Sequence, residues 1–364
     1  MPLRFSTLSE AQDFTAKAWE VGLRGRNPER DVEYWKLGIN LSRALDIVRH
    51  VWHTTALDLS TNLFVESPTI NRMAARLYDG SALHPQELVR MREGDDSRPL
   101  YLFAGGTGLL LQYSDFVRSL DYPGVIYGVP VTGMNRRDEY SRSIPEEAAR
   151  VVRLISRVHP GGAFRIMGYS SGGCVTLEAG RLLRSQGREV GFLGLLDTGL
   201  TDHYWPFGVW LSYMLPGLME TVKKRVQRVF QAAAKAGPAA PPADIVAPRR
   251  GTRYEFRFRD PTKPDYAFRS PHWRSDITPS DGLTRQRSLE MWGLYEPARY
   301  DGQVTFFFAI SPNSISCSPQ KYWPAYLSHV DWVPVPGNHI TMMVGRYAVK
   351  LTAEVSARLR ATLG

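Results

Sequence analysis

The stretch that most constrains this 364-residue chain is FRIMGYSSGGCV at residues 164–175, in which Gly168, Ser170 and Gly172 form a G-x-S-x-G pattern. Small residues around a serine are typical of a sharp turn from a strand into a helix, because larger side chains would clash with both elements. Such a turn leaves the serine hydroxyl accessible instead of buried. The amide of Ser171, at the start of the helix, can then donate to an oxyanion that forms beside Ser170.

By itself the G-x-S-x-G pattern is a weak signal, because glycine and serine are common. Its context is more specific. An amphipathic helix is predicted from Pro145 to about Val158, followed by a Pro-Gly-Gly turn at residues 160–162 and the apolar strand that leads into the serine. This order favours a nucleophile over a plain glycine–serine turn.

Two further strands are followed by residues that can complete a catalytic triad. The apolar strand at residues 191–197 ends in Asp197, and His339 lies in a loop after the strand that begins at residue 333. The carboxyl ends of parallel strands meet at the edge of the sheet where Ser170 is expected. The structural alternatives are that Asp197 caps the following turn and that His339 is an ordinary loop histidine. The chain order Ser, Asp, His favours a triad of the α/β-hydrolase type.

A glycine-rich loop follows the apolar strand at residues 99–103. Its sequence, AGGTG at residues 104–108, lets backbone amides approach a ligand closely. In α/β-hydrolases the loop after this strand supplies the second oxyanion donor. A phosphate-binding loop is the alternative, but the Lys-Ser/Thr ending of such a loop is absent.

Residues 1–82 predict a small helical bundle. We expect one helix capped by Ser9, a second from Leu41 to about His50 and a third from Thr69 to Leu77. The segments KAWE (17–20), YWKLGINLSRAL (34–45), LFVESPTI (63–70) and AARL (74–77) resemble the carrier domain of nonribosomal peptide and polyketide synthases.

Carrier domains attach phosphopantetheine to a serine in a Leu-Gly-Gly-Asp/His-Ser-Leu segment. The matching run here is Leu-Gly-Ile-Asn-Leu-Ser, which puts Leu41 at the position of that serine. Ser42 is one residue later, a rotation of about 100° on a helix. The resemblance therefore implies a degenerate carrier rather than one loaded at Ser42. Its role is open between docking and a relic that packs on the next domain.

From about Pro99 onward the chain resembles the thioesterase domains that terminate these synthases. The matching residues are the glycine loop (105–108), GYSSGG (168–173), LLDT (195–198), YEP (295–297) with YDG (300–302), and GNHITM (337–342). The resemblance implies an α/β fold, namely an α/β-hydrolase domain at residues 99–364 with a large helical lid, preceded by the carrier-like bundle at 1–82 and a linker at 83–98. Many members have His-Pro where this chain has Leu102 and Phe103, so the second oxyanion donor stays open between Ala104 and Gly105.

The predicted lid, residues 200–290, begins with an aromatic segment. A basic amphipathic helix from Met219 to Ala234 follows, then a Pro/Ala-rich run and an arginine-rich stretch from Arg249 to Arg274. A long insertion of this kind is usually functional. We expect apolar helices over the serine and a basic outer face. The alternatives are ordinary core aromatics with solvated charges, and a helix that lies on a membrane surface.

The resemblance implies acyl transfer from a phosphopantetheine thioester, with Ser170 as nucleophile, His339 as its base and Asp197 orienting the imidazole. We expect no bound cofactor and no metal. Because the fused carrier lacks its serine, we expect delivery in trans by an acidic acyl- or peptidyl-carrier domain. Its docking face would be the basic cluster of the lid helix, Lys223, Lys224, Arg225 and Arg228.

The net charge of +9 also fits nucleic acid, but no nucleic-acid-binding motif is present. Neither a basic-then-apolar leader nor a membrane-spanning apolar run is found, so we expect a cytoplasmic protein. The two cysteines, Cys174 and Cys317, lack metal-ligand spacing. An ordinary carboxylesterase and a non-catalytic synthase scaffold remain alternative functions. The sequence does not choose between hydrolysis and cyclisation or amide formation.

Overall fold

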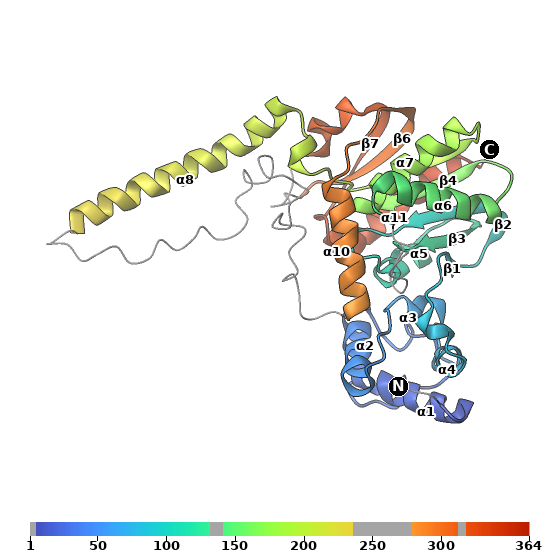
Figure 1. Cartoon of the computed structure of the whole chain (residues 1–364). Helices are drawn as coiled ribbons and strands as arrows, with labels where there is room; N and C mark the ends of the chain where they lie inside the picture. Colours follow the sequence, from blue (N-terminus) through green and yellow to red (C-terminus); the bar gives the residue numbers. More distant parts are fainter. Residues whose placement is uncertain (1–4, 132–140, 236–277, 312–317, 364) are drawn as a thin grey trace.

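The computed structural model describes residues 5–131, 141–235, 278–311 and 318–363. The chain forms a helical N-terminal unit, residues 5–84, and a larger part in which helices flank a sheet (Figure 1). The arginine-rich stretch from Arg249 to Arg274, the Pro/Ala-rich run before it and Cys317 lie outside the described residues.

Four helices build the N-terminal unit: α1 (Leu8–Gly22), α2 (Leu41–Thr55), α3 (Leu63–Glu66) and α4 (Ile70–Tyr78), followed by the 3-10 helix η1 (Ser81–Leu83). The first amides of a helix need acceptors, and the side chains of Thr7, Asn40 and Thr69 supply them for α1, α2 and α4. The predicted cap at Ser9 is wrong, because α1 begins at Leu8 and Thr7 caps it.

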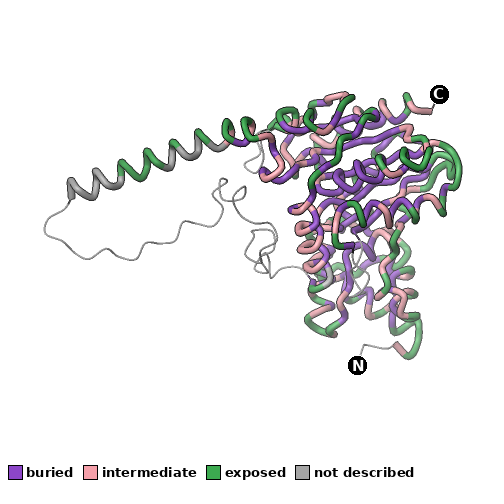
Figure 2. The backbone as a smooth tube through the Cα atoms, turned by 45° about the horizontal axis from the view of Figure 1, so that its top comes forward, coloured by how far each residue is buried: buried purple, intermediate pink, exposed green. Residues whose placement is uncertain are grey.

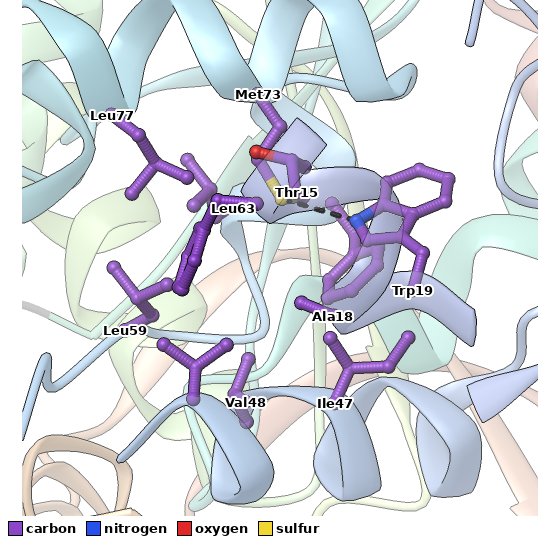
Figure 3. Close-up of a pocket in the computed structure, with 12 residues that line it drawn as sticks. Thr15, Ala18, Trp19, Ile47, Val48, Leu59, Leu63, Met73 and Leu77 are labelled. Atoms are coloured by element: carbon purple, nitrogen blue, oxygen red, sulfur yellow. Dashed lines mark hydrogen bonds between the residues drawn. The ribbon is translucent and has the colours of Figure 1, made fainter. Parts of the chain in front are cut away.

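Trp19 lies at the centre of the core of this unit and is fully buried. Figure 3 shows it beside Ile47 and Met73, where its indole N–H donates to the Met73 sulfur at 3.3 Å. The pocket drawn there is lined almost entirely by apolar side chains of α1 to α4 and the loop before α3. It is therefore part of the core of the unit and not a ligand site.

Leu41 is the first residue of α2, directly after the cap Asn40. Its half-buried side chain packs against the core of the unit, whereas Ser42 is exposed. The position that resembles a phosphopantetheine attachment point is thus occupied by an apolar side chain with a packing role.

The linker predicted at residues 83–98 is wrong for much of its length. Residues Val89–Arg92 form strand β1, and strand β2 (Asp95–Phe103) begins within the predicted linker. β1 pairs antiparallel with β3 (Gly124–Val129), and Val89 is buried. β1 is an edge strand in which two of the four residues, Arg90 and Arg92, are charged. Its sequence therefore lacks the apolar pattern that would have identified a strand.

Among the described residues, the sheet has seven strands in the order β1-β3-β2-β4-β5-β6-β7. The other four strands are β4 (Phe164–Tyr169), β5 (Val190–Leu196), β6 (Tyr300–Ala309) and β7 (Leu327–Val335). All pairs except β1–β3 are parallel. The predicted α/β class is therefore confirmed, and the strand ends that carry the candidate residues share one edge.

Helices cover both faces of the sheet. Alternate strand residues point to opposite faces, so Ile166 packs with α6 (Ile144–Val158) and α7 (Ser171–Ser185), whereas Met167 packs with α5 (Ser114–Ser119) and α11 (Gly345–Ala361). Figure 2 shows the buried strands running between these layers. Because both faces are covered, the central strands read as continuous apolar runs.

The insertion predicted as a lid contains α8 (Phe207–Lys235) and α10 (Pro279–Gly293). Trp205 and Trp210 anchor its start in the main core. From there α8 runs away from the sheet in both views (Figures 1 and 2), with Met219 and Lys223 exposed. The expectation that this basic helix covers the serine is therefore wrong. α10 lies beside α7, the helix that begins directly after Ser170.

None of the described helices has both the length and the apolar character needed to cross a lipid bilayer.

The N-terminal unit and α10 meet at a buried carboxyl group. Asp281 accepts a hydrogen bond from the Ser60 hydroxyl at 3.0 Å and one from the amide of Thr61. Burial, reinforced by the nearby Asp58, raises the pKa of Asp281 from 3.8 to about 6, although the bonds from Ser60, Thr61 and Thr278 oppose this shift. The folded state therefore favours the neutral form of Asp281.

This raised pKa predicts that stability falls as pH rises. The contribution of neutral Asp281 is complete below pH 3.8 and is lost as pH rises to about 6, a change of up to about 3 kcal/mol in the free energy of unfolding. Asp281→Asn should remove this loss. Urea unfolding at pH 4.5 and 7.5 measures it, with the exposed Asp46→Asn as control. Equal pH dependence in wild type and Asp281→Asn would contradict the prediction.

Candidate active site

Ser170 stands between β4 and α7 in a backbone conformation that is rare for residues with a side chain, with φ 55° and ψ −128°. Such a conformation costs of order 1–3 kcal/mol and persists only where the surroundings enforce it. The Ser170 amide donates to the Leu196 carbonyl at 2.9 Å, and its own carbonyl accepts from Gly173 at 3.1 Å. Both bonds hold the turn that lifts the hydroxyl above the sheet edge.

The glycines around Ser170 are required by close packing. A Cβ on Gly172 would lie 2.3 Å from the carbonyl oxygen of Ala104, and one on Gly168 would lie 2.2 Å from the Thr176 hydroxyl. Neither contact is possible, so α7 packs against β4 and against the turn after β2 only because these side chains are absent. This confirms the physical reason for the small residues in the motif.

The structure brings Ser170, His339 and Asp197 together. The His339 Nε2 lies 3.0 Å from the Ser170 Oγ, and its Nδ1 lies 2.7 Å from an Asp197 carboxylate oxygen. The side chains of Asp197 and His339 are 14% and 27% exposed, so the imidazole can reach both solvent and the serine. One hydrogen-bonded chain therefore runs from a shielded carboxylate through the histidine to the serine hydroxyl.

Asp197 directly follows β5 and is held by two hydrogen bonds with β6. Its backbone has a positive φ of 44°. Its amide donates to Phe307 at 2.7 Å, and its second carboxylate oxygen accepts the Ala309 amide at 3.0 Å. β6 thus fixes the carboxylate. The contacts of Asp197 with β6 and His339 favour a role beside the histidine over that of a simple turn cap.

The loop that carries His339 is stabilised by the residue before it. The Asn338 side chain accepts from the amides of Ile340 and Thr341 at 3.0 and 2.9 Å. Gly337 allows the turn with φ 93°. Local hydrogen bonds that involve neither Ser170 nor Asp197 therefore stabilise the turn at Asn338.

Tyr169 is a site residue that sequence reasoning missed. Its ring stacks on the His339 imidazole, with ring centres 4.9 Å apart, and its hydroxyl donates to the His339 carbonyl oxygen. Burial raises the pKa of Tyr169 well above its usual value, so it stays a neutral donor. Its position directly before Ser170 could have singled it out in the sequence. Its contact with His339, 170 residues later, could not be predicted from any local pattern.

The predicted oxyanion donors differ in their hydrogen bonds. The Ala104 amide donates to the Val129 carbonyl at 3.0 Å, because Ala104 extends the β2–β3 ladder by one residue. The Gly105 amide donates to the hydroxyl of Tyr113 at 2.8 Å. Both amides thus donate within the chain in this structure, and the identity of the second donor stays a prediction. The Ser171 amide, at the first position of α7, remains a predicted donor.

Cys174 is buried in α7, where burial raises the pKa of its thiol, so it is a packing residue and not a nucleophile. Within the part of the chain that the structure describes, no group of three or more His, Cys, Asp or Glu side chains could hold a metal ion.

Residues 98–206, which include Ser170 and Asp197, match the family model for a thioesterase domain. The chain is 29% identical over 179 residues to a dimodular nonribosomal peptide synthase of Bacillus subtilis (strain 168), a match that covers 48% of this chain and 7% of that protein. It is 27% identical over 192 residues to an indigoidine synthase of Streptomyces lavendulae, covering 52% of this chain and 15% of that protein. The chain thus spans only a small part of these relatives.

The crystal structure of a holo four-domain nonribosomal peptide synthetase bound to AMP and glycine aligns with a TM-score of 0.56 at 18% identity. The alignment covers 98% of this chain and 26% of that chain, so the shared fold extends over the N-terminal unit. Together, these findings confirm the resemblance of the sheet region to the thioesterase domains of such synthases.

The packing around Ser170 predicts that Gly172→Ala disrupts the site. The new methyl group must displace the backbone at Ala104, so the free energy of unfolding should fall by about 2–3 kcal/mol. Gly161→Ala is the matched control, because no atom lies within 4 Å of a Cβ there. Chemical denaturation of both variants measures the difference. Equal stabilities would contradict the packing argument.

Proposed function

We propose that this protein is a serine thioesterase that releases an acyl or peptidyl chain from the phosphopantetheine thioester of a carrier domain through an acyl-enzyme on Ser170. The observation that carries the proposal is the hydrogen-bonded chain Ser170–His339–Asp197, with distances of 3.0 and 2.7 Å, next to a thioesterase-domain match. A serine hydroxyl is a weak nucleophile at neutral pH unless a base activates it, and His339 is in position to do so.

In the first half-reaction, His339 Nε2 takes the hydroxyl proton as the Ser170 Oγ bonds to the thioester carbonyl carbon. The Ser171 amide donates to the oxyanion that develops. When the tetrahedral intermediate collapses, its C–S bond breaks and His339 returns the proton to the departing thiol. Asp197 holds the imidazole with Nε2 facing the serine and stabilises its charged form.

In the second half-reaction, an oxygen or nitrogen nucleophile attacks the acyl-enzyme carbonyl carbon and His339 again takes its proton. The ester bond to the Ser170 Oγ then breaks, and His339 returns the proton to that oxygen, which restores the free serine. Water gives hydrolysis, whereas a hydroxyl or amine of the acyl chain gives cyclisation or amide formation. The outcome depends on how well the site excludes water.

We further propose that the substrate arrives in trans. Leu41 has no nucleophilic atom for attaching phosphopantetheine, so the N-terminal unit acts as a degenerate carrier. The exposed basic residues of α8, including Lys223 and Arg225, offer a docking surface for an acidic acyl- or peptidyl-carrier domain of a synthase. Two alternatives have other consequences: a small-molecule carboxylesterase would ignore a carrier, and a non-catalytic scaffold would not need Ser170.

Intact-protein mass spectrometry tests the covalent route. Wild type mixed with an excess of acyl-pantetheine thioester and quenched early should carry an acyl adduct that is absent from Ser170→Ala. The same variant should lose at least about 1000-fold in kcat. Ser171→Ala, which keeps the proposed amide donor, is the matched control and should retain the adduct. An adduct that persists in Ser170→Ala would refute the proposed nucleophile, and faster turnover of small oxygen esters would favour the carboxylesterase.

The docking surface is tested by charge reversal. Lys223→Glu with Arg225→Glu should lower kcat/KM for a carrier-bound thioester about tenfold at low salt, with less effect at 1 M salt, because exposed charges are then screened. Hydrolysis of soluble acyl-pantetheine should be unchanged. Arg153→Glu with Arg157→Glu on α6, two exposed residues of equal charge, is the control. An equal loss of kcat/KM with both substrates would contradict the docking proposal.

A further inference from the structure

We propose that the N-terminal unit is a fixed support beside the active site. Its Asn62 is a positioning residue for the glycine loop, taken from here on as residues 104–110, which lies next to Ser170. The role in catalysis rests on the thioesterase function proposed above. The positioning itself rests on contacts between the two parts of the chain.

Asn62 is fully buried and uses both ends of its side-chain amide on the glycine loop. Its Nδ2 donates to the Gly108 carbonyl oxygen at 2.9 Å, and its Oδ1 accepts the Leu110 amide at 2.7 Å. A carbonyl and an amide of the loop are thereby satisfied at once. Removal of the Asn62 side chain would leave both of these groups buried without a partner, which disfavours the present loop conformation.

The glycine loop held in this way lies against the nucleophile. A Cβ on Gly105 would lie 3.2 Å from the Ser170 Cβ, and one on Gly106 would lie 3.3 Å from the Ser171 hydroxyl. On its other side the loop meets α10: a Cβ on Gly108 would lie 2.8 Å from a Thr284 methyl group. Asn62 and α10 therefore hold the loop from two directions, and a shift of the loop changes the space beside Ser170.

Other buried contacts fasten the N-terminal unit to the sheet region. The Tyr34 hydroxyl donates to the Ser114 hydroxyl at 2.6 Å, and Ser60 donates to Asp281 on α10 at 3.0 Å. Leu111, directly after the glycine loop, packs in the core of the N-terminal unit and not in either core of the sheet region. These contacts tie the unit to α5, α10 and the loop simultaneously, which a carrier domain that must swing between partners cannot keep.

The consequence for catalysis is geometric. A displacement of about 1 Å at a reacting centre can lower the rate about 100-fold without weakening binding in proportion. Asn62 touches neither Ser170 nor His339, so its effect must act through the loop. We therefore expect the loss of Asn62 to lower kcat rather than to raise KM.

The experiment compares Asn62→Ala and Asn62→Asp with wild type in the full chain, using soluble acyl-pantetheine thioester. Both variants lose the bond to Gly108, and Asn62→Asp keeps an acceptor for Leu110. Each should lower kcat about 10- to 100-fold with KM within about threefold. Asn71→Ala is the matched control, because Asn71 also makes two side-chain hydrogen bonds, but with Gln12 and Asp31 inside the N-terminal unit. It should leave kcat unchanged.

Hydrogen exchange supplies a readout that does not depend on activity. In wild type the Leu110 amide should exchange as slowly as the amides of α2, and in Asn62→Ala at least about tenfold faster, with α2 unchanged. Rapid exchange of Leu110 in wild type would overturn the proposal even if both variants failed to fold. Wild-type kcat in a folded Asn62→Ala would overturn it as well. A wild type that forms no acyl-enzyme with the thioester would refute the proposed function, but exchange would still decide whether Asn62 holds the loop.

Discussion

The strained backbone of Ser170 is the constraint on which the rest of the site depends. With φ 55°, the serine stays in place only because β4 and α7 are packed tightly against the turn after β2. That packing needs the glycines at 168 and 172 and a central position in a covered parallel sheet. The same sheet delivers Asp197 at the next strand end and His339 after β7, so one architectural feature brings all three groups to a single edge.

Much of this could be predicted from the sequence because the signals are local. The strand–turn–helix around Ser170, the apolar strand before Asp197 and the amphipathic α6 each occupy one continuous segment with a clear period or motif. The chain order of the three candidate residues then suggested their meeting point. Glycines near the serine needed only the argument that two backbones approach closely, and the distances at Gly172 agree with it.

The features that could not be predicted depend on contacts between distant segments. β1 is a short, charged edge strand whose only strong signal is its pairing with β3. The amides of Ala104 and Gly105 donate to Val129 and Tyr113, which no local pattern around the glycine loop indicates. The stacking of Tyr169 on His339 joins residues 169 and 339. The amphipathic pattern from Met219 to Ala234 predicted a helix there, but α8 already begins at Phe207, within the aromatic segment. The pattern also does not encode the direction in which the helix leaves the domain.

The buried contacts of the carrier-like N-terminal unit bear on whether this unit moves. A working carrier must release its partners, so its surface cannot be bound through many buried hydrogen bonds at once. Here the position that resembles the attachment point holds Leu41, a core-packing side chain, and the unit makes buried hydrogen bonds to the sheet region and α10 from Tyr34, Ser60 and Asn62. Without the arm there is no need for the unit to move. A fixed unit can then bury polar groups against the glycine loop, since the cost of burying them is offset only where the partners stay in place.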